Sequence, residues 1–276
     1  MTRSRALLVS CLALASLAPS ARAQAPDLPV AARAEFLRTA RVIRSQGHST
    51  GVTSPYRLTL TDGVTTHDAS FQSVDERADK ADFGARGVEF NFADSHHFNL
   101  AAYQIAGMLG LEGMMPVTVR RTWNGRDGTL TWWVDDAIDE RTRLREKLEP
   151  PNAALWRQQQ FRMRAFAALV GDTDRNLGNI LIDTRHWTLW MIDFTRAFRR
   201  QPGLKSTTGL TQIDRALLAR LRTLDGARVR QETAHCLNGY EVDALMARRN
   251  ALVAHFDRLI ADKGAAAVLY GLEPKP

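Results

Sequence analysis

Cysteine is almost absent from this chain of 276 residues, which contains only Cys11 and Cys236. Cys11 lies in a segment that we expect to be removed, so Cys236 would have no partner for an intrachain disulfide. After that segment no apolar run reaches about 18 residues, and the rest of the sequence predicts no membrane-spanning helix. Internal repeats, low-complexity segments and a glycine-rich phosphate-binding loop are missing as well. These absences favour a globular protein whose core is held by packing.

The N-terminal segment has the anatomy of a secretory signal peptide. Two arginines precede an apolar run over residues 6–18 that is too short to span a bilayer, and residues 21–23 (Ala-Arg-Ala) supply a cleavage site. We expect cleavage after Ala23 and export, to a bacterial periplasm or out of the cell. Residues 8–11 (Leu-Val-Ser-Cys) resemble a lipid-attachment motif, but the apolar run continues past Cys11, which favours the ordinary signal peptide.

The charge balance gives no sign of a nucleic-acid partner. The whole chain has a net charge of +7, and loss of Arg3, Arg5 and Arg22 with the signal peptide would leave 34 basic and 30 acidic residues, a net charge of +4. This small excess is spread along the sequence, which indicates solubility rather than a nucleic-acid surface. The remaining length is enough for one large domain or for two lobes around a cleft.

Hydrophobic periodicity predicts a β-rich first half. Helical spacing covers residues 30–46 and Phe98–Leu109, with Gly110 as a C-cap, whereas residues 75–87 are charged and indicate a loop. The expected strands form two hairpins: residues 56–60 and 65–74 around Asp62-Gly63, and residues 117–122 and 129–134 around a second turn.

The second half is mainly helical. Helices are predicted from Pro150-Pro151-Asn152 to Val170, over residues 211–221 and over residues 241–260, with a strand pair over 180–182 and 187–192. The expected fold class is therefore α+β with two lobes. The predicted divisions are a signal peptide (1–23), a leader with a helix (24–50), a first lobe (51–136) and a second lobe (137–276).

Two motifs in the second half carry most of the functional information. Residues 171–180 are Gly-Asp-Thr-Asp-Arg-Asn-Leu-Gly-Asn-Ile, and residues 189–194 are Leu-Trp-Met-Ile-Asp-Phe. They resemble the catalytic loop and the metal-binding Asp-Phe element of atypical kinases, namely phosphatidylinositol kinases, HipA-type kinases and the secretory-pathway (Golgi casein kinase) group. Residues 100–120 are similar to the N-lobe helix and strand of the secretory kinases. The resemblance implies a protein kinase-like fold, with an antiparallel sheet and one helix in the N-lobe and a mainly helical C-lobe.

The resemblance also implies roles for individual residues. Asp174 would be the catalytic carboxylate that orients the acceptor hydroxyl and receives its proton. Asn179 and Asp193 would bind Mg²⁺ or Mn²⁺ that carries ATP, since hard oxygen ligands suit Mg²⁺. Arg175 and Asn176 would support the loop. The partners implied are a nucleotide and a phosphate acceptor that the sequence does not identify.

The N-lobe departs from the kinase pattern. An active kinase pairs a Lys on its third strand with a Glu on the helix, and this pair holds the nucleotide phosphates. Here Gln72 and Asn99 occupy the expected positions, or Asn91 replaces Gln72 if the alignment shifts, so neutral amides stand in for the ion pair. Four basic residues are candidates to supply the missing charge from elsewhere: Lys80, Arg86, Arg120 and Arg121. The alternative to an active kinase is therefore a pseudokinase or binding scaffold.

Other patterns support weaker hypotheses. Asp172, Asp174, Asn176 and Asp183 match four positions of a calcium-binding loop, but Leu177 stands where that loop requires Gly. His96-His97 has no spaced third metal ligand, which favours a surface or capping role. Trp132-Trp133 is expected to pack. The basic residues after the Asp-Phe element, Arg196, Arg199 and Arg200, are expected to be a solvated stretch rather than a phosphate site.

Overall fold

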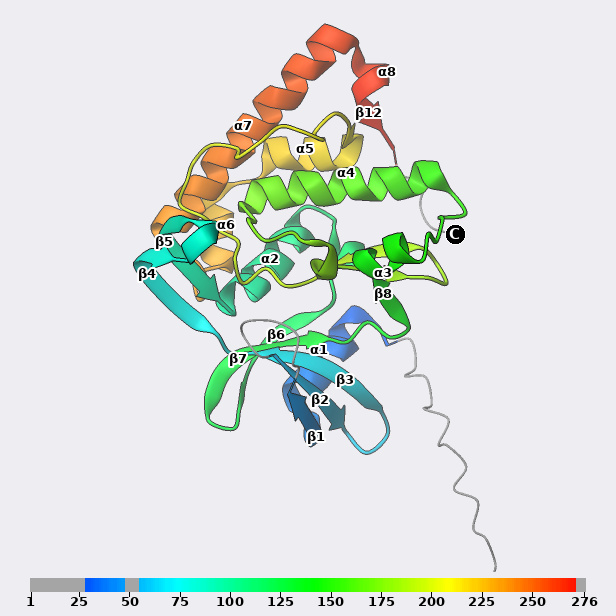
Figure 1. The fold of residues 1–276 in the computed structure, drawn as a ribbon, viewed down its shortest axis with the longest axis vertical. Coiled ribbons are helices and arrows are strands. Elements are labelled where there is room, and N and C mark those ends of the chain that lie inside the picture. Colours follow the sequence, from blue (N-terminus) through cyan, green and yellow to red (C-terminus); the bar gives the residue numbers. More distant parts are fainter. Residues whose placement is uncertain (1–27, 48–54, 272–276) are drawn as a thin grey trace, which may run out of the picture.

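The computed structural model describes residues 28–47 and 55–271, and for Arg86 only the backbone. The predicted signal peptide and Cys11 lie outside these ranges. The N-terminal part contains a five-stranded antiparallel sheet, and the C-terminal part is mainly helical (Figure 1). The predicted α+β architecture is therefore confirmed. Within the described residues no helix is long and apolar enough to cross a membrane.

The main sheet follows from alternating side chains. Its strand order is β1 (Arg41–Gly47), β2 (Tyr56–Thr61), β3 (Thr66–Gln72), β7 (Arg126–Trp132) and β6 (Thr118–Trp123). One face buries Leu58, Leu60 and Phe71, which pack with Phe36 and Leu37 of helix α1 (Val30–Thr39) in one apolar cluster. The opposite face of β2 and β3 is polar, because successive side chains of a strand alternate between faces. Both predicted hairpins are present.

The helix predicted over residues 30–46 is wrong in its second half. Helix α1 ends at Thr39, and strand β1 begins at Arg41 and pairs with β2. Arg121 donates hydrogen bonds to the carbonyl oxygens of Leu37 and Ala40, at 2.7 Å each, and so satisfies acceptors at the helix end. Strand β1 is largely exposed, so burial leaves little periodic signal in its sequence.

The charged segment predicted as a loop is also a strand. Residues Asp75–Asp82 form β4, which pairs antiparallel with β5 (Val88–Ser95) in a separate two-stranded sheet, with the short helix η1 (Gly84–Arg86) at its turn. Nearly every residue of β4 is exposed, which explains its polar sequence. The hairpin lies beside the helical part (Figure 1), and Arg77 on β4 donates a 2.6 Å hydrogen bond to Glu241 there.

The helical part surrounds a small sheet. Helix α2 (His97–Met108) and η2 (Glu112–Met114) lead from β5 to β6. The helices that follow are α3 (Glu140–Arg145), α4 (Ala153–Val170), α5 (Arg215–Thr223), α6 (Gly226–Glu232), α7 (Gly239–Lys263) and α8 (Ala265–Val268). The small sheet has the order β10 (Thr188–Met191), β9 (Ile180–Asp183), β8 (Ala137–Asp139), and β11 (Ile213–Asp214) pairs with β12 (Leu269–Tyr270).

Capping residues set the ends of the two long helices. Asn152 caps α4 at its start, and Gly171, with φ 63°, ends it. Asn238 and Glu241 form a reciprocal capping box at the start of α7. The predicted helix over 211–221 instead begins at Arg215, because Asp214 caps it and Ile213 belongs to β11. Asp172 and the loop that carries Asp174 and Asn179 follow directly after Gly171.

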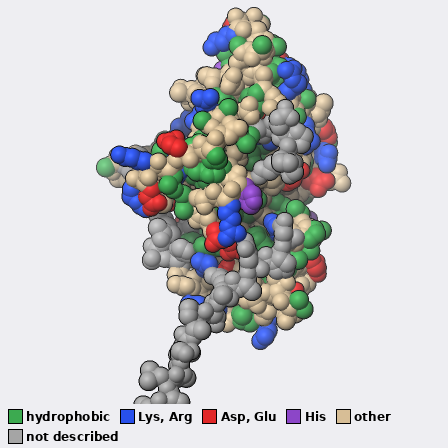
Figure 2. Space-filling model, turned by 90° about the vertical axis from the view of Figure 1, so that its right-hand side faces the viewer, with side chains coloured by type: hydrophobic (Ala, Val, Ile, Leu, Met, Phe, Trp, Pro, Cys, Tyr) green, Lys and Arg blue, Asp and Glu red, His purple; other side chains and the backbone are tan. Residues whose placement is uncertain are grey.

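The surface mixes both signs of charge. On the face shown in Figure 2, acidic and basic side chains are interspersed, and no basic patch dominates the part that is coloured. This matches the spread of charge along the sequence. Cys236 is buried as a free thiol, and burial raises its pKa to about 11, so the thiol is protonated and unreactive at neutral pH.

Candidate active site

The loop after α4 is braced by a buried arginine. The left-handed Gly171 packs against the guanidinium of Arg248 on α7, where a Cβ would lie 2.8 Å from its Cζ. Arg248 is 2 % exposed and donates hydrogen bonds to the carbonyl oxygens of Leu169, Arg199 and Gln201. The end of α4 and the segment after the Asp-Phe element are therefore fixed to the same side chain.

Arg175 joins the two motifs predicted from the sequence. Its guanidinium pairs with the carboxylate of Asp172, with Nε 2.8 Å from Oδ2. It also donates to the carbonyl oxygens of Asn179 (2.7 Å), Ile192 (2.5 Å) and Asp193 (3.2 Å). The same group lies 4.2 Å above the ring of Phe194. These contacts bring the backbone of Asn179 and that of Asp193 to the same guanidinium.

Asp174 and Asn179 are linked through the backbone. The side-chain amide of Asn179 donates to the carbonyl oxygen of Asp174 at 2.9 Å, and Asn176 donates to the same oxygen at 3.3 Å. The carboxylate of Asp174 is exposed and accepts only from Asn176 among the side chains that the structure describes, at 3.3 Å. Because the side-chain amide nitrogen of Asn179 donates to the loop, its side-chain oxygen can accept from or coordinate another group. This leaves a carboxylate and an amide oxygen on one loop.

Asp193 has a constrained backbone. Its φ is 56°, in the left-handed region that Asp tolerates better than most residues. The hydroxyl of Thr195 donates to its Oδ1 at 3.0 Å. Thr195 thus holds the carboxylate of Asp193 in place.

Asp94 is a candidate site residue that the sequence reasoning missed. It lies near the end of β5, is 8 % exposed, and its Oδ1 is buried without a hydrogen-bond partner. Burial raises the pKa of Asp94, and the nearby negative charge of Asp193 raises it further, against the opposing effects of Thr195 and Arg196. Two carboxylates that repel each other at a buried position are stabilised by a cation. Asp94, Asp193 and Asn179 therefore fit a hard divalent ion, whose further ligands would come from water and nucleotide phosphates.

Asp94 was missed because β5 was not predicted. The alternation of apolar Val88, Phe90 and Phe92 with polar Glu89 and Asn91 is a strand pattern that leads up to Asp94. The backbone N–H of Ser95 bonds to the carbonyl of Thr195 at 2.9 Å, and this contact between distant segments sets Asp94 beside Asp193. A signal would have been the small and apolar residues just before the two histidines.

The two amides of the N-terminal part do meet. Asn99 on α2 donates to Oε1 of Gln72 on β3 at 2.6 Å, and its own Oδ1 accepts the backbone N–H of Phe194 at 2.7 Å. A chain of hydrogen bonds therefore runs from the main sheet through α2 to the Asp-Phe element. It carries no charge, in contrast to the Lys-Glu pair of an active kinase.

Two of the four basic residues suggested as replacements have other partners. Arg120 forms a two-pronged ion pair with Asp127, and Arg121 binds the end of α1. Lys80 is exposed on β4, outside the main sheet. Arg86 lies at the turn of that hairpin, and its side chain is not described. Asn91 is exposed on β5, so it does not take the place of Gln72.

A different cation shares the polar face of the sheet with Gln72. Arg57 on β2 is paired in register with Ser70, two residues before Gln72, so the three side chains lie on one face. Its Nε donates to Asp68 at 2.6 Å, and its guanidinium lies 4.0 Å above the ring of Trp133. The charge of Arg57 is therefore balanced by Asp68. Sequence reasoning overlooked Arg57 because it searched for a cation on β3 and beyond.

Contacts also bear on three weaker hypotheses. Asp172 is paired with Arg175, and Asp183 with His186 across a 2.7 Å contact, so two of the four positions that match a calcium-binding loop have other partners. Arg199 is buried and paired with Glu89, so the expectation of a solvated stretch is wrong there, because the unforeseen strand β5 supplies the carboxylate. Trp132 packs as expected, with its ring stacked 3.8 Å from that of His67.

Comparison with solved structures identifies the architecture. The hydra Fam20 structure with sugar superposes with a TM-score of 0.66 at 13 % identity, over 87 % of this chain and 91 % of that one. The Golgi casein kinase superposes with a TM-score of 0.65 at 11 % identity, over 89 % of this chain and 79 % of that one. The fold is that of an atypical kinase. No protein-family model matches the sequence, and no curated protein matches it.

Within this fold, two sets of hydrogen bonds link the segments that carry the predicted site residues. The catalytic-loop and Asp-Phe motifs lie together through Arg175, and the amide pair lies at the junction of β3 and α2. Because the sequence identities are low, the likeness shows the fold alone. The roles of Asp174, Asn179 and Asp193 therefore stay predictions that rest on the local geometry.

Proposed function

We propose that the protein is an exported phosphotransferase that uses ATP with Mg²⁺ or Mn²⁺. The observation that carries the proposal is the linkage of both motifs by Arg175, which bonds to the backbone of Asn179 and Asp193 at once. Asp94, with its unpartnered buried oxygen, adds a carboxylate beside Asp193. A bound divalent ion would neutralise charge on the nucleotide phosphates.

The chain's own groups suit the remaining chemistry. In phosphoryl transfer the acceptor oxygen bonds to the γ-phosphorus, the bond from that phosphorus to the β–γ bridging oxygen breaks, and ADP leaves. The exposed carboxylate of Asp174 is positioned to orient the acceptor hydroxyl and to take its proton. Asn176 and Asn179 both donate to the carbonyl oxygen of Asp174 and so hold the loop that carries this carboxylate.

A second candidate is a pseudokinase that binds nucleotide without transferring phosphate. It is favoured by the hydrogen bond between Gln72 and Asn99, which replaces the ion pair expected of an active kinase. The cation on the same sheet face, Arg57, is already paired with Asp68. Without a positive charge that binds the nucleotide phosphates, the nucleotide is positioned less well, while metal binding is affected less. Phosphate transfer would therefore be lost more readily than nucleotide binding.

One experiment separates the two candidates. Purified protein is mixed with Mg²⁺ and γ-labelled ATP, and both transfer of label and stabilisation against heat are measured for the wild type, Asp174→Asn, Asp193→Asn and Asp262→Asn. An active kinase loses transfer in the first two variants, while the exposed control Asp262→Asn on α7 behaves as wild type. A pseudokinase is stabilised by Mg²⁺ and ATP without transfer, and Asp193→Asn alone removes the effect. Neither binding nor transfer by the wild type would refute both.

Export is a separate part of the proposal. It is supported by the charge and hydrophobic pattern of residues 1–23. Mass spectrometry of the N-terminus of protein recovered outside the cytoplasm is expected to begin at Gln24. A lipidated Cys11 would instead establish the membrane-anchored alternative, and an intact Met1 in the cytoplasm would refute export.

A further inference from the structure

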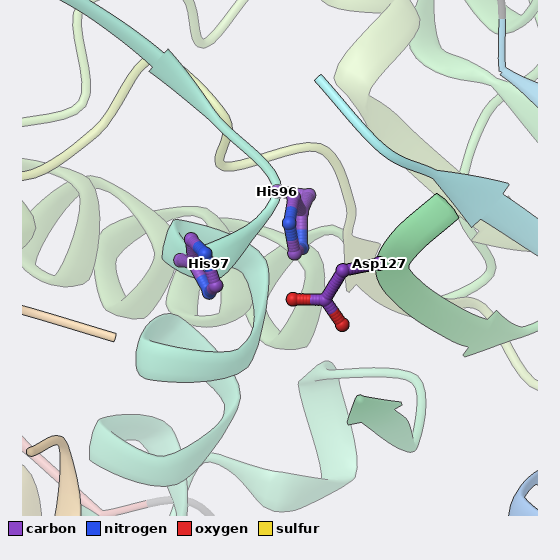
Figure 3. A group of neighbouring side chains, drawn as sticks. All are labelled: His96, His97 and Asp127. Atoms are coloured by element: carbon purple, nitrogen blue, oxygen red, sulfur yellow. The ribbon is translucent and has the colours of Figure 1, made fainter. Parts of the chain in front are cut away.

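Three potential metal ligands converge away from the candidate active site. Ligand atoms of His96, His97 and Asp127 all lie within 4.8 Å of one another, and across residues 28–47 and 55–271 this is the one such group of His, Cys, Asp or Glu. Figure 3 shows the three side chains facing a common space, with the histidines at the start of α2 and Asp127 at the start of β7. Asp127 is the third ligand that the sequence around the histidines did not reveal.

The geometry of the histidine pair is unusual for neighbouring residues. Adjacent residues of a helix do not face each other. His96, however, immediately precedes α2, and its ring centroid lies 4.0 Å from that of His97, with the planes tilted by 34°. The two imidazoles therefore present their edges to the same region.

One ring nitrogen of His96 is buried without a hydrogen-bond partner. The residue is 2 % exposed, and its Nδ1 is buried without a hydrogen-bond partner. A buried polar atom without a partner in a native fold requires an explanation, such as a bound water or ion. Its backbone, by contrast, is well satisfied, since His96 N donates to the carbonyl of Val74 at 2.7 Å.

The charges around the group are compatible with a cation. Arg120 grips Asp127 through both carboxylate oxygens, at 2.7–3.0 Å, and Asp75 lies 3.9 Å from Nε2 of His97. Each carboxylate oxygen retains a second lone pair, so Asp127 can bind an ion while it keeps Arg120. In that arrangement Arg120 fixes the orientation of the ligand, as outer partners do in metal sites.

We propose that His96, His97 and Asp127 bind a transition metal ion of the zinc class, with water as the fourth ligand. Two imidazoles and a carboxylate form a ligand set typical of zinc, with bond lengths of about 2.0–2.2 Å. Around a tetrahedral ion with bonds of these lengths the ligand atoms lie about 3.4 Å apart, so the three side chains, whose ligand atoms lie within 4.8 Å of one another, must move closer by roughly 1 Å to bind it. The bound ion ties the start of α2 to strand β7 of the main sheet.

This site is distinct from the proposed magnesium site. His96 and His97 lie on the element that also carries Asn99, whose hydrogen bonds lead to Gln72 and Phe194. Because its histidines lie at the start of α2, the metal fixes the position of that helix. It contributes no group to phosphoryl transfer. It exists whether or not the protein is an active kinase.

The test is zinc binding by tag-free protein that a chelator has stripped of metal. Calorimetry with Zn²⁺ alone is expected to give one ion per chain for the wild type, and the ion is expected to raise the unfolding temperature because it binds only the folded state. His97→Gln and Asp127→Asn are each expected to weaken binding at least about tenfold, since loss of even an outer partner has effects of that size.

Two controls make the result specific. His186→Gln removes an exposed histidine that is also paired with a carboxylate, Asp183, and is expected to bind Zn²⁺ as the wild type does. Asp193→Asn is also expected to leave zinc binding unchanged, so failure of the proposed kinase function would not affect the outcome. Unfolding temperatures without metal show whether a variant is folded. Substoichiometric binding by the wild type, or equal affinity in His97→Gln and Asp127→Asn, would overturn the proposal.

Discussion

The substitution Asn99→Ala tests the chain of hydrogen bonds between the sheet and the Asp-Phe element. Asn99 is 5 % exposed, and its loss leaves the buried N–H of Phe194 without the acceptor that it now has at 2.7 Å. An unsatisfied buried group destabilises a fold by about 1–3 kcal/mol, and the lost bond to Gln72 adds about 0.5–1.5 kcal/mol. We therefore expect the free energy of unfolding to fall by about 1.5–4.5 kcal/mol.

Two further variants calibrate this magnitude. Gln72→Ala is expected to cost no more than about 1.5 kcal/mol, because Gln72 is only half-buried and water can replace its oxygen. Asn250→Ala, at an exposed position of α7, is expected to change stability by less than about 0.5 kcal/mol.

The assay is equilibrium unfolding in urea, followed by tryptophan fluorescence and by circular dichroism. Coincident transitions from the two probes are required before a single free energy is assigned to a protein of this size. If Asn99→Ala unfolded with the same midpoint as Asn250→Ala, the bond from Phe194 to Asn99 would not stabilise the Asp-Phe element, and the prediction would be refuted. A loss by Gln72→Ala equal to that of Asn99→Ala would also contradict the assignment of the larger effect to Phe194.

Three other substitutions test separate parts of the site. The raised pKa of Asp94 means that the folded state binds a proton more tightly than the unfolded state, so stability falls as pH rises from the ordinary pKa of 3.8 through the pKa of the folded state. Asp94→Asn is therefore expected to stabilise the metal-free protein at pH 7 but not below pH 3.8. The variant is also expected to lose stabilisation by Mg²⁺, and thermal unfolding at the two pH values will measure both effects. Arg175→Lys keeps the charge but cannot reach three carbonyls at once, so weaker stabilisation by Mg²⁺ and ATP is expected, and an unchanged response would contradict the bracing role. Arg248→Met leaves the carbonyl oxygens of Leu169, Arg199 and Gln201 without this donor, and because each unsatisfied buried group costs about 1–3 kcal/mol, stability is expected to fall by at least about 3 kcal/mol; a loss below about 1 kcal/mol in urea unfolding would count against it.

Much of the architecture was predictable from local patterns. Helices α2, α4 and α7 have apolar periodicity and capping residues that act within a few positions, such as Asn152 and Gly171 at the ends of α4. The hairpins around Asp62-Gly63 and residues 124–125 have turn chemistry that is equally local. The position of the loop from Asp174 to Asn179 was predictable for the same reason, because it directly follows the capped end of α4, while the roles of its residues stay predictions.

The errors arose where distant contacts decide the local structure. Strand β4 is exposed and charged, and only its pairing with β5 makes it a strand. Strand β1 is similarly exposed, so its residues continued the helical pattern of α1. Asp94 and Asp127 belong to the two proposed metal sites because the fold brings them next to segments more than twenty residues away. The spacing of residues in the sequence does not predict such contacts.

Thr195 has a consequence for how the protein is regulated. A glycine after the Asp-Phe pair lets the backbone rotate freely, and an element with that freedom can move between alternative positions. Here Thr195 bonds to Asp193, Arg175 holds the Asp193 carbonyl and Asn99 holds Phe194. We expect this element to have one populated conformation, so that the proposed phosphotransferase would be controlled by the supply of nucleotide and metal and not by a conformational switch. Relaxation-dispersion NMR that detected exchange at Thr195 would refute this expectation.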